Sequence, residues 1–219
     1  MESVPKKQRI LYVGNSLTYF NNLPSLIREI AEQDGVEISD SGFLYPDYSL
    51  EDHWNENKVA AATASGKFDF VVVQQGPSAM PESQAMLKDY AGRFAQLCRE
   101  AGSKLALYMV WPSQARSFDF DNVINSYTSA ARAHDALICP AGRAWKYAWQ
   151  SDAALPLYSS DRFHPSIYGS VLSALTIYGS LYEKKDFKFL KHSRSCWKEA
   201  IPADKMKLLE KAALLAMAD

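Results

Sequence analysis

Short apolar runs alternate with helix-period segments along most of this 219-residue chain, and this alternation is the feature that most limits its fold. The clearest run is 68–73, in which Phe70 is followed by three valines without a polar interruption. Such continuous apolar character is typical of a strand that helices cover on both faces of a parallel sheet. The alternation therefore predicts βα units and a three-layer α/β/α sandwich with about five parallel strands.

The boundaries of the elements follow from periodicity and from turn residues. Pro24 fits the first turn of a helix, where its missing N–H costs nothing. The chain changes character after residue 139: a small-residue helix precedes a charged, irregular stretch at 184–195 and an amphipathic C-terminal helix. We expect strands at 10–13, 36–39, 68–73, 105–110 and 136–139, and helices at 24–32, 50–65, 81–101, 120–133, 144–150, 166–182 and 202–217.

These elements predict a single domain over residues 1–219, with a core at about 9–183. The helix at about 202–217 has an apolar stripe, so it docks either on this domain or on a partner chain, which would make a homo-oligomer. The N-terminal residues are polar and basic, and no apolar run approaches the roughly 20 residues of a membrane span. These features predict a cytoplasmic protein.

Composition narrows the possible partners. The formal net charge is −1, and acidic and basic residues are mixed along the chain, whereas a nucleic-acid partner normally requires a basic face. Cys98, Cys139 and Cys196 are widely spaced and predict neither a disulfide framework nor a zinc site. We expect no metal and no cofactor, and a small molecule as the substrate.

Ser16 follows the first expected strand, in the segment Gly14-Asn15-Ser16-Leu17-Thr18. Open parallel sheets bind their ligands beyond the carboxyl ends of the strands, so Ser16 belongs to the functional edge. Glycine at position 14 permits an unusual backbone angle, and a following helix would leave N–H groups near the serine for an oxyanion. Ser16 is therefore a candidate nucleophile; the alternative is a serine that only caps the next helix.

A second candidate group lies far downstream, in Asp161-Arg162-Phe163-His164-Pro165. Pro165 biases His164 toward extended backbone just before a helix, and Asp161 on the same loop can reach its Nδ1. This contact would fix the tautomer and leave Nε2 to take a proton from Ser16. The alternative is an aspartate that caps the turn beside an exposed histidine. Because the two groups are independent, their combination favours catalysis.

The chain resembles the SGNH/GDSL hydrolase superfamily over roughly residues 9–183. Gly14-Asn15-Ser16-Leu17 is similar to its first block, with asparagine in place of aspartate, and Asp161-x-x-His164-Pro165 matches its last block in full. The resemblance implies a flavodoxin-like sandwich and a catalytic triad. In that triad Ser16 attacks an ester carbonyl, His164 is the general base and Asp161 orients the histidine.

The two middle blocks of the superfamily supply further oxyanion donors, and this sequence departs from both. A glycine N–H usually follows the second strand; here Gly42 is one candidate and the backbone near Tyr48 is another. The third block normally has Gly-x-Asn-Asp, whereas this chain has two glutamines, Gln74 and Gln75. A glutamine amide can donate the same hydrogen bond. We expect the oxyanion hole to consist of Ser16, Tyr48 and Gln75, and strand alternation leaves either glutamine, but not both, facing the site.

Other residues at the same edge can form a substrate pocket. Trp111 follows the fourth strand, and with Tyr45 and Arg116 it could form a wall suited to a sugar ring or an acyl chain. Asn15 and Gln74 complete the expected pocket. His53 lies near the start of a helix, where we expect it to have a structural role.

Three functions remain open at this point. The first is a serine hydrolase that cleaves carboxylic esters, with acetyl groups on carbohydrate as one substrate. The second is a glycan- or ester-binding module without turnover, which the altered middle blocks favour. The third is a flavodoxin-like protein in which the loop after Gly14 holds a cofactor phosphate. Turnover of p-nitrophenyl acetate by a colourless protein would separate the first from the others.

Overall fold

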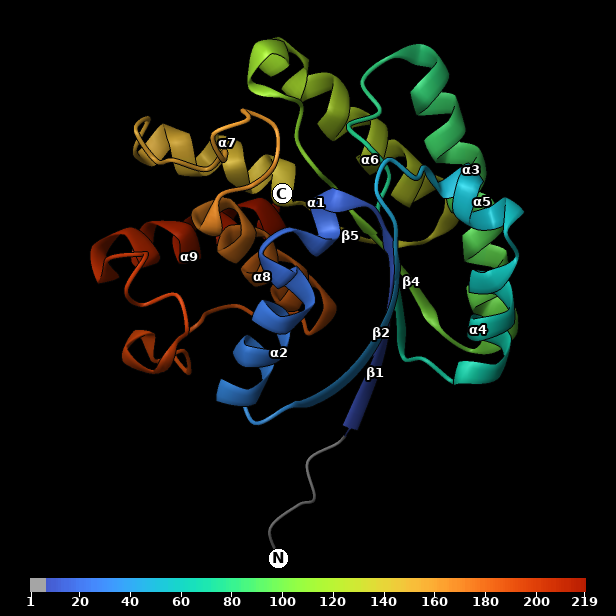
Figure 1. Cartoon of the computed structure of the whole chain (residues 1–219), viewed down its shortest axis with the longest axis horizontal. Coiled ribbons are helices and arrows are strands. Elements are labelled where there is room, and N and C mark those ends of the chain that lie inside the picture. The colour runs from blue at the N-terminus through green and yellow to red at the C-terminus, as the bar shows by residue number, and fades with distance from the viewer. Residues whose placement is uncertain (1–6) are drawn as a thin grey trace, which may run out of the picture.

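The computed structural model describes residues 7–219, and the predictions about the domain and the N-terminus that involve residues 1–6 lie outside this range. Five parallel strands form one sheet in the order β2-β1-β3-β4-β5 (Figure 1). Their bounds are β1 Lys7–Gly14, β2 Glu37–Leu44, β3 Phe70–Val73, β4 Lys104–Tyr108 and β5 Leu137–Cys139. This is the strand order of flavodoxin-like sheets, in which the topological switch point lies between β1 and β3.

Helices cover both faces of the sheet. The layer that contains α2 and α8 packs on one face, and α3 to α6 cover the other (Figure 1). The helices are α1 Ser16–Tyr19, α2 Leu23–Gln33, α3 Leu50–Asn55, α4 Lys58–Gly66, α5 Pro81–Ala101, α6 Phe120–His134, α7 Ala141–Ser151, α8 Ile167–Leu181 and α9 Ala203–Ala218. Three 3₁₀ segments lie at Phe20–Asn22, Gln114–Asp119 and His192–Arg194. The expected three-layer α/β/α sandwich is confirmed.

Burial explains why these segments take these places. All four residues of β3 are buried, and β4 is buried from Leu105 onward, as expected for strands inside a doubly covered sheet. α8 is buried along almost its whole length, since small residues allow a close approach to the sheet. Its buried hydroxyls bond to the preceding turn: Ser173 donates to Gly169 O and Thr176 donates to Leu172 O.

Two elements differ from the expectation. The helix expected at 50–65 is two helices, because Asn57 adopts a left-handed conformation (φ 58°) that ends α3 and begins α4. The second strand runs on to Leu44 instead of ending at Ser39, since β1 pairs with it along its full length. This extension places Gly42 inside β2, opposite Tyr12.

The C-terminal helix docks on the domain. α9 packs against α7 and α8, and it buries most of the predicted stripe: Met206, Leu209, Ala212 and Ala213 are at most 1% exposed. The expected homo-oligomer stays a prediction, although the stripe is used within the chain. Within residues 7–219, no helix combines the length and apolar character that a bilayer crossing requires.

Candidate active site

The nucleophile turn, residues 14–18 with the candidate nucleophile Ser16, begins where β1 ends, beside the switch point of the sheet. Asn15 caps the short α1, its side chain accepting a hydrogen bond from Leu17 N–H, and Ser16 is the first residue of the helix. A Cβ at Gly14 would lie 2.6 Å from the Gln74 side-chain oxygen, so only glycine allows this close approach. Gln74 Oε1 in turn accepts hydrogen bonds from Asn15 N–H (3.0 Å) and the Thr18 hydroxyl (2.8 Å).

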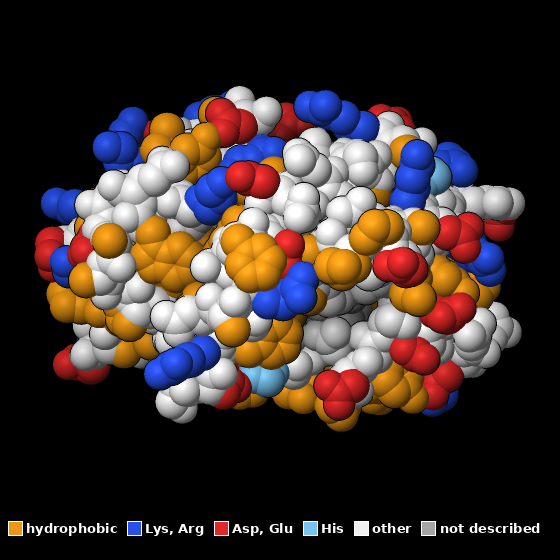
Figure 2. All heavy atoms as spheres, turned by 90° about the horizontal axis from the view of Figure 1, so that it is seen from above, with side chains coloured by type: hydrophobic (Ala, Val, Ile, Leu, Met, Phe, Trp, Pro, Cys, Tyr) orange, Lys and Arg blue, Asp and Glu red, His pale blue; other side chains and the backbone are white. Residues whose placement is uncertain are grey.

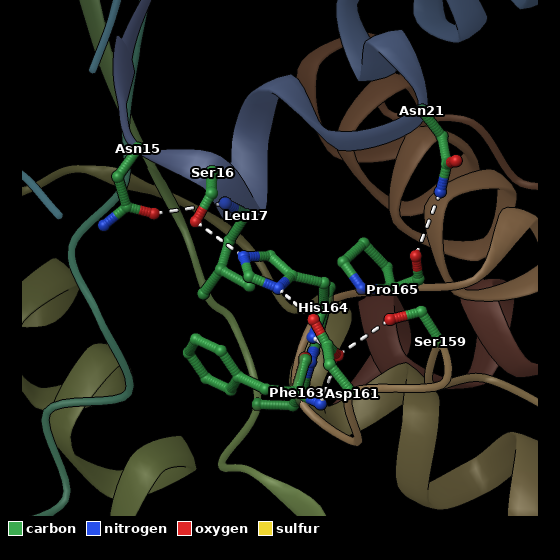
Figure 3. A network of polar contacts seen from close by, with 10 residues as sticks. Asn15, Ser16, Leu17, Asn21, Ser159, Asp161, Phe163, His164 and Pro165 are labelled. Carbon is green, nitrogen blue, oxygen red and sulfur yellow. Dashed lines mark hydrogen bonds and ion pairs between the residues drawn. The ribbon is translucent and has the colours of Figure 1, made fainter. Parts of the chain in front are cut away.

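The structure brings Ser16, His164 and Asp161 together in a continuous chain of hydrogen bonds (Figure 3). His164 Nε2 lies 2.8 Å from Ser16 Oγ, and His164 Nδ1 lies 2.5 Å from Asp161 Oδ2. Ser16 is 9% exposed, so its hydroxyl is shielded but opens on a cavity. With Nδ1–H donated to Asp161, Nε2 can accept the serine proton.

The Asp161 carboxylate is held by its own loop (Figure 3). Besides the His164 ring, it accepts hydrogen bonds from the Ser159 hydroxyl and from the N–H groups of Phe163 and His164. Partial desolvation raises the pKa of Asp161, but these hydrogen bonds outweigh it and hold the pKa well below its usual range. Asp161 therefore stays ionised and can stabilise an imidazolium at His164.

Two residues just after Ser16 reach the loop that carries His164, and neither is among the site residues that the sequence predicts. The Phe20 ring stacks on the His164 imidazole. Asn21 Nδ2 donates to Pro165 O (Figure 3) and also to Ser170 Oγ. A run of two asparagines after an aromatic residue, a turn signal next to the candidate nucleophile, is the only sequence feature that could have drawn attention to them.

A cavity of about 450 Å³ opens beside Ser16. Figure 2 looks onto this edge of the sheet and shows hydrophobic side chains gathered around a hollow. Polar groups from Asn15, Ser49 and Arg116 line the cavity together with the apolar side chains of Met80 and Phe163. The cavity is therefore mixed in character and suits a ligand that has both hydroxyl and apolar parts.

Arg116 is fixed at the rim of this cavity. Its guanidinium pairs with the buried Asp119 carboxylate and contacts the Met80 sulfur, and it lies over the exposed Phe118 ring. The Asp119 carboxylate balances the positive charge of Arg116. The Arg116–Asp119 pair therefore offers N–H donors at the cavity rim with little net charge.

The expected oxyanion donors lie in the cavity wall. Ser16 N–H has no acceptor among residues 7–219. Tyr48 O accepts a hydrogen bond from Asn15 Nδ2, which ties the loop after β2 to the nucleophile turn. Gln75 is 4% exposed, and its Nε2 donates to Ser78 Oγ and Ser83 O, so it would have to exchange one of these bonds to reach an oxyanion. Gly76, which also lines the cavity, has a backbone N–H without an acceptor in the described chain.

The remaining expected pocket residues lie behind the cavity wall. Trp111 is fully buried, stacks on Trp145 and donates its Nε1–H to Phe163 O, so it supports the triad loop from beneath. The Tyr45 ring packs against His53 instead of lining the cavity. Gln74 is 1% exposed, and its amide is used within the nucleophile turn and by Gln75 O.

Comparison with known proteins gives no matching family model and no matching curated protein. Solved structures do match. A DUF4886 family protein from Bacteroides uniformis has a TM-score of 0.80 and 18% identity, over 97% of this chain and 95% of its own. A candidate SGNH hydrolase from Slackia heliotrinireducens has a TM-score of 0.67 and 24% identity, over 80% of this chain and 100% of its own.

An acetyl-xylooligosaccharide esterase from Geobacillus has a TM-score of 0.55 and 16% identity, and the match covers 87% of this chain and 99% of the esterase. At these identities the likeness concerns the fold. The protein has the SGNH/GDSL-type hydrolase fold that the two sequence blocks implied.

Proposed function

We propose that the protein is a serine hydrolase that cleaves carboxylic esters. The observation that carries this proposal is the relay from Asp161 through His164 to Ser16, with both contacts within hydrogen-bond distance. Its position at the switch point of the sheet, beside an open cavity, gives further support. The SGNH/GDSL-type fold of the chain agrees with this reaction class.

In the proposed reaction, Ser16 Oγ attacks the ester carbonyl carbon while its proton passes to His164 Nε2. Asp161 stabilises the resulting imidazolium, and the oxyanion is bound by Ser16 N–H together with groups near Tyr48 and Gln75. The tetrahedral intermediate then expels the alcohol, which takes the proton from His164. Water then attacks the acyl carbon and gives a proton to His164 Nε2. The bond from the acyl carbon to Ser16 Oγ breaks, Oγ takes the proton back from His164, and the carboxylic acid is released.

We further propose that the substrate is an O-acetylated carbohydrate. The polar groups of Asn15, Ser49 and Arg116 lie among the apolar side chains of the cavity wall, so the wall can bond to sugar hydroxyls and also pack against an acyl group. The Geobacillus neighbour acts on acetylated xylooligosaccharides, which supports the same substrate class. The alternative of a binding module without turnover gains no support from the triad, since binding alone requires no such relay.

Labelling with a fluorophosphonate probe tests the nucleophile. We expect wild-type protein to be labelled and Ser16→Ala to remain unlabelled, and equal labelling of the two would refute the assignment.

Asp161→Asn should lower kcat by about 10³–10⁴-fold, because the histidine loses its oriented tautomer. A panel of p-nitrophenyl esters beside acetylated sugars then tests the substrate, and a preference for long acyl chains would exclude acetylated carbohydrate.

A further inference from the structure

The His164 imidazole is enclosed by aromatic rings as well as by the triad. Phe20 covers one face, with ring centroids 4.3 Å apart and an interplanar angle of 14°. The Phe163 ring meets the imidazole edge-on, with ring centroids 5.2 Å apart and an interplanar angle of 63°. The His164 side chain is 22% exposed, so most of its surface lies against protein. The face-on contact comes from the segment that carries the nucleophile, only four residues after Ser16.

Asn21 joins the same two segments through the backbone. It adopts a left-handed conformation (φ 51°), which asparagine tolerates better than most residues, and its Nδ2 reaches Pro165 O at 3.0 Å and Ser170 Oγ at 2.9 Å. Pro165 directly follows His164, and it is 144 positions from Asn21 in sequence. The side chain therefore connects the turn after the nucleophile to the loop of the base.

We propose that Phe20 and Asn21 are positioning residues for the general base, an inference that rests on the proposed roles of Ser16 and His164. Asn21 fixes the distance between the His164 loop and the nucleophile turn. Phe20 keeps the imidazole plane aligned with Ser16 Oγ, and its π face favours the imidazolium that forms when the serine gives up its proton. Phe20 therefore acts most strongly in the transition state.

Few other groups influence the positive charge that His164 takes on in the proposed reaction. Among the described residues, Asp161 is the one ionised group that pairs with His164, and the Ser16 hydroxyl is its other polar contact. Phe20 and Phe163 carry no charge, and among the described residues no Lys or Arg forms a hydrogen bond with the imidazole. A change at position 20 should therefore act on the imidazolium without altering its ion pair.

Kinetics on p-nitrophenyl acetate test the role of Phe20. We expect Phe20→Leu to lower kcat by about three- to tenfold with little change in KM, and to shift the acid limb of the pH profile to lower pH. Phe20→Tyr keeps the aromatic face, so its kcat and the acid limb of its pH profile should match those of the wild type. Tyr19→Leu is the matched control, since Tyr19 is an exposed aromatic ring of the same segment that stacks on Phe20 rather than on His164.

The role of Asn21 is tested by two substitutions. Asn21→Gly keeps the left-handed backbone accessible but removes both hydrogen bonds, and it should lower kcat about tenfold. Asn21→Asp places a carboxylate against Pro165 O and should cost more activity than Asn21→Gly. A loss confined to thermal stability, with kcat unchanged in both variants, would overturn the role of Asn21.

An NMR experiment separates this inference from the proposed function. The four histidines give few imidazole signals, and the His164 signals should move with Phe20→Leu but not with Tyr19→Leu. If the wild type hydrolyses esters but Phe20→Leu matches Tyr19→Leu in kinetics and spectra, the positioning role is overturned. If the spectra respond as expected while no ester is cleaved, the stacking stands and the hydrolase proposal fails.

Discussion

Gln74 shows how a single buried amide stabilises the nucleophile turn. It accepts from Asn15 N–H and from the Thr18 hydroxyl, and both donors are buried. Methionine has a similar length but no comparable acceptor, so Gln74→Met should lower the free energy of unfolding by about 2–4 kcal/mol in urea titrations. Gln84→Met, at a partly exposed helix position, is the control and should cost under about 1 kcal/mol. Equal losses in the two variants would contradict the role of Gln74.

His53 provides a prediction about pH. Its Nε2 donates to Gly14 O at 2.9 Å, whereas its buried Nδ1 has no partner among the described residues. Burial lowers the pKa of His53 below 6.5, although the bond to Gly14 O and the carboxylates of Glu56 and Asp52 act in the opposite direction. The unfolded chain therefore binds a proton at a higher pH than the folded protein does. The stability that neutral His53 contributes is present above pH 6.5 and is lost as the pH falls.

The measurement compares unfolding free energies at pH 7.5 and pH 5.5. Wild type should lose up to about 1.4 kcal/mol per pH unit more than His53→Gln, which keeps a donor for Gly14 O but does not titrate. An equal loss in both proteins would show that other groups cause the pH dependence.

The sequence was informative about which residues meet at the candidate site and less so about what surrounds them. Ser16 and the Asp161–His164 pair were recognisable because each lies at a predictable place relative to a strand or helix. Whether an aromatic side chain lines the cavity or lies behind its wall depends on the residues that pack over it. Nothing in the sequence near Trp111 indicates the stacking partner that buries it. The contacts of Phe20 and Asn21 are equally remote, since they join segments about 145 residues apart.

At the scale of elements, the ends of helices carry the clearest prediction. α4 ends at Gly66, and the next residue, Lys67, caps it in a left-handed conformation (φ 50°) that glycine takes without strain. Lys67→Gly should therefore raise the free energy of unfolding by about 0.5–1 kcal/mol. Lys88→Gly lies inside α5, at an exposed position, and should lower it by about 1 kcal/mol. Changes of the same sign in urea titrations would contradict the conformational argument.

Strands and long helices were predictable because the apolar residues that bury them recur at a regular spacing in the sequence. α5 begins and ends where the pattern predicts, between Pro81 and Gly102. The break between α3 and α4 was missed, because Asn57, which tolerates the left-handed conformation it adopts, lies next to an alanine-rich segment whose helix pattern hid it. The length of β2 depends on its partner β1 and not on its own weak apolar pattern.

For the whole molecule, α9 raises the question of what its apolar face stabilises. Leu209 is fully buried against the same chain, so Leu209→Ala should lower the free energy of unfolding by about 2–5 kcal/mol. If the helix acts within one chain, the stability of wild type and variant should not depend on protein concentration. A midpoint that rises with concentration would instead support the predicted homo-oligomer.

The separation of Ser16 and His164 by 148 positions has a consequence for biosynthesis. During synthesis, the candidate nucleophile therefore leaves the ribosome long before the candidate base does. Until the segment that becomes α8 can pack on the sheet, a nascent chain holds a serine without a proton acceptor. Hydrolysis would then begin only with completion of the fold, and ester turnover during synthesis would report how many chains have reached it.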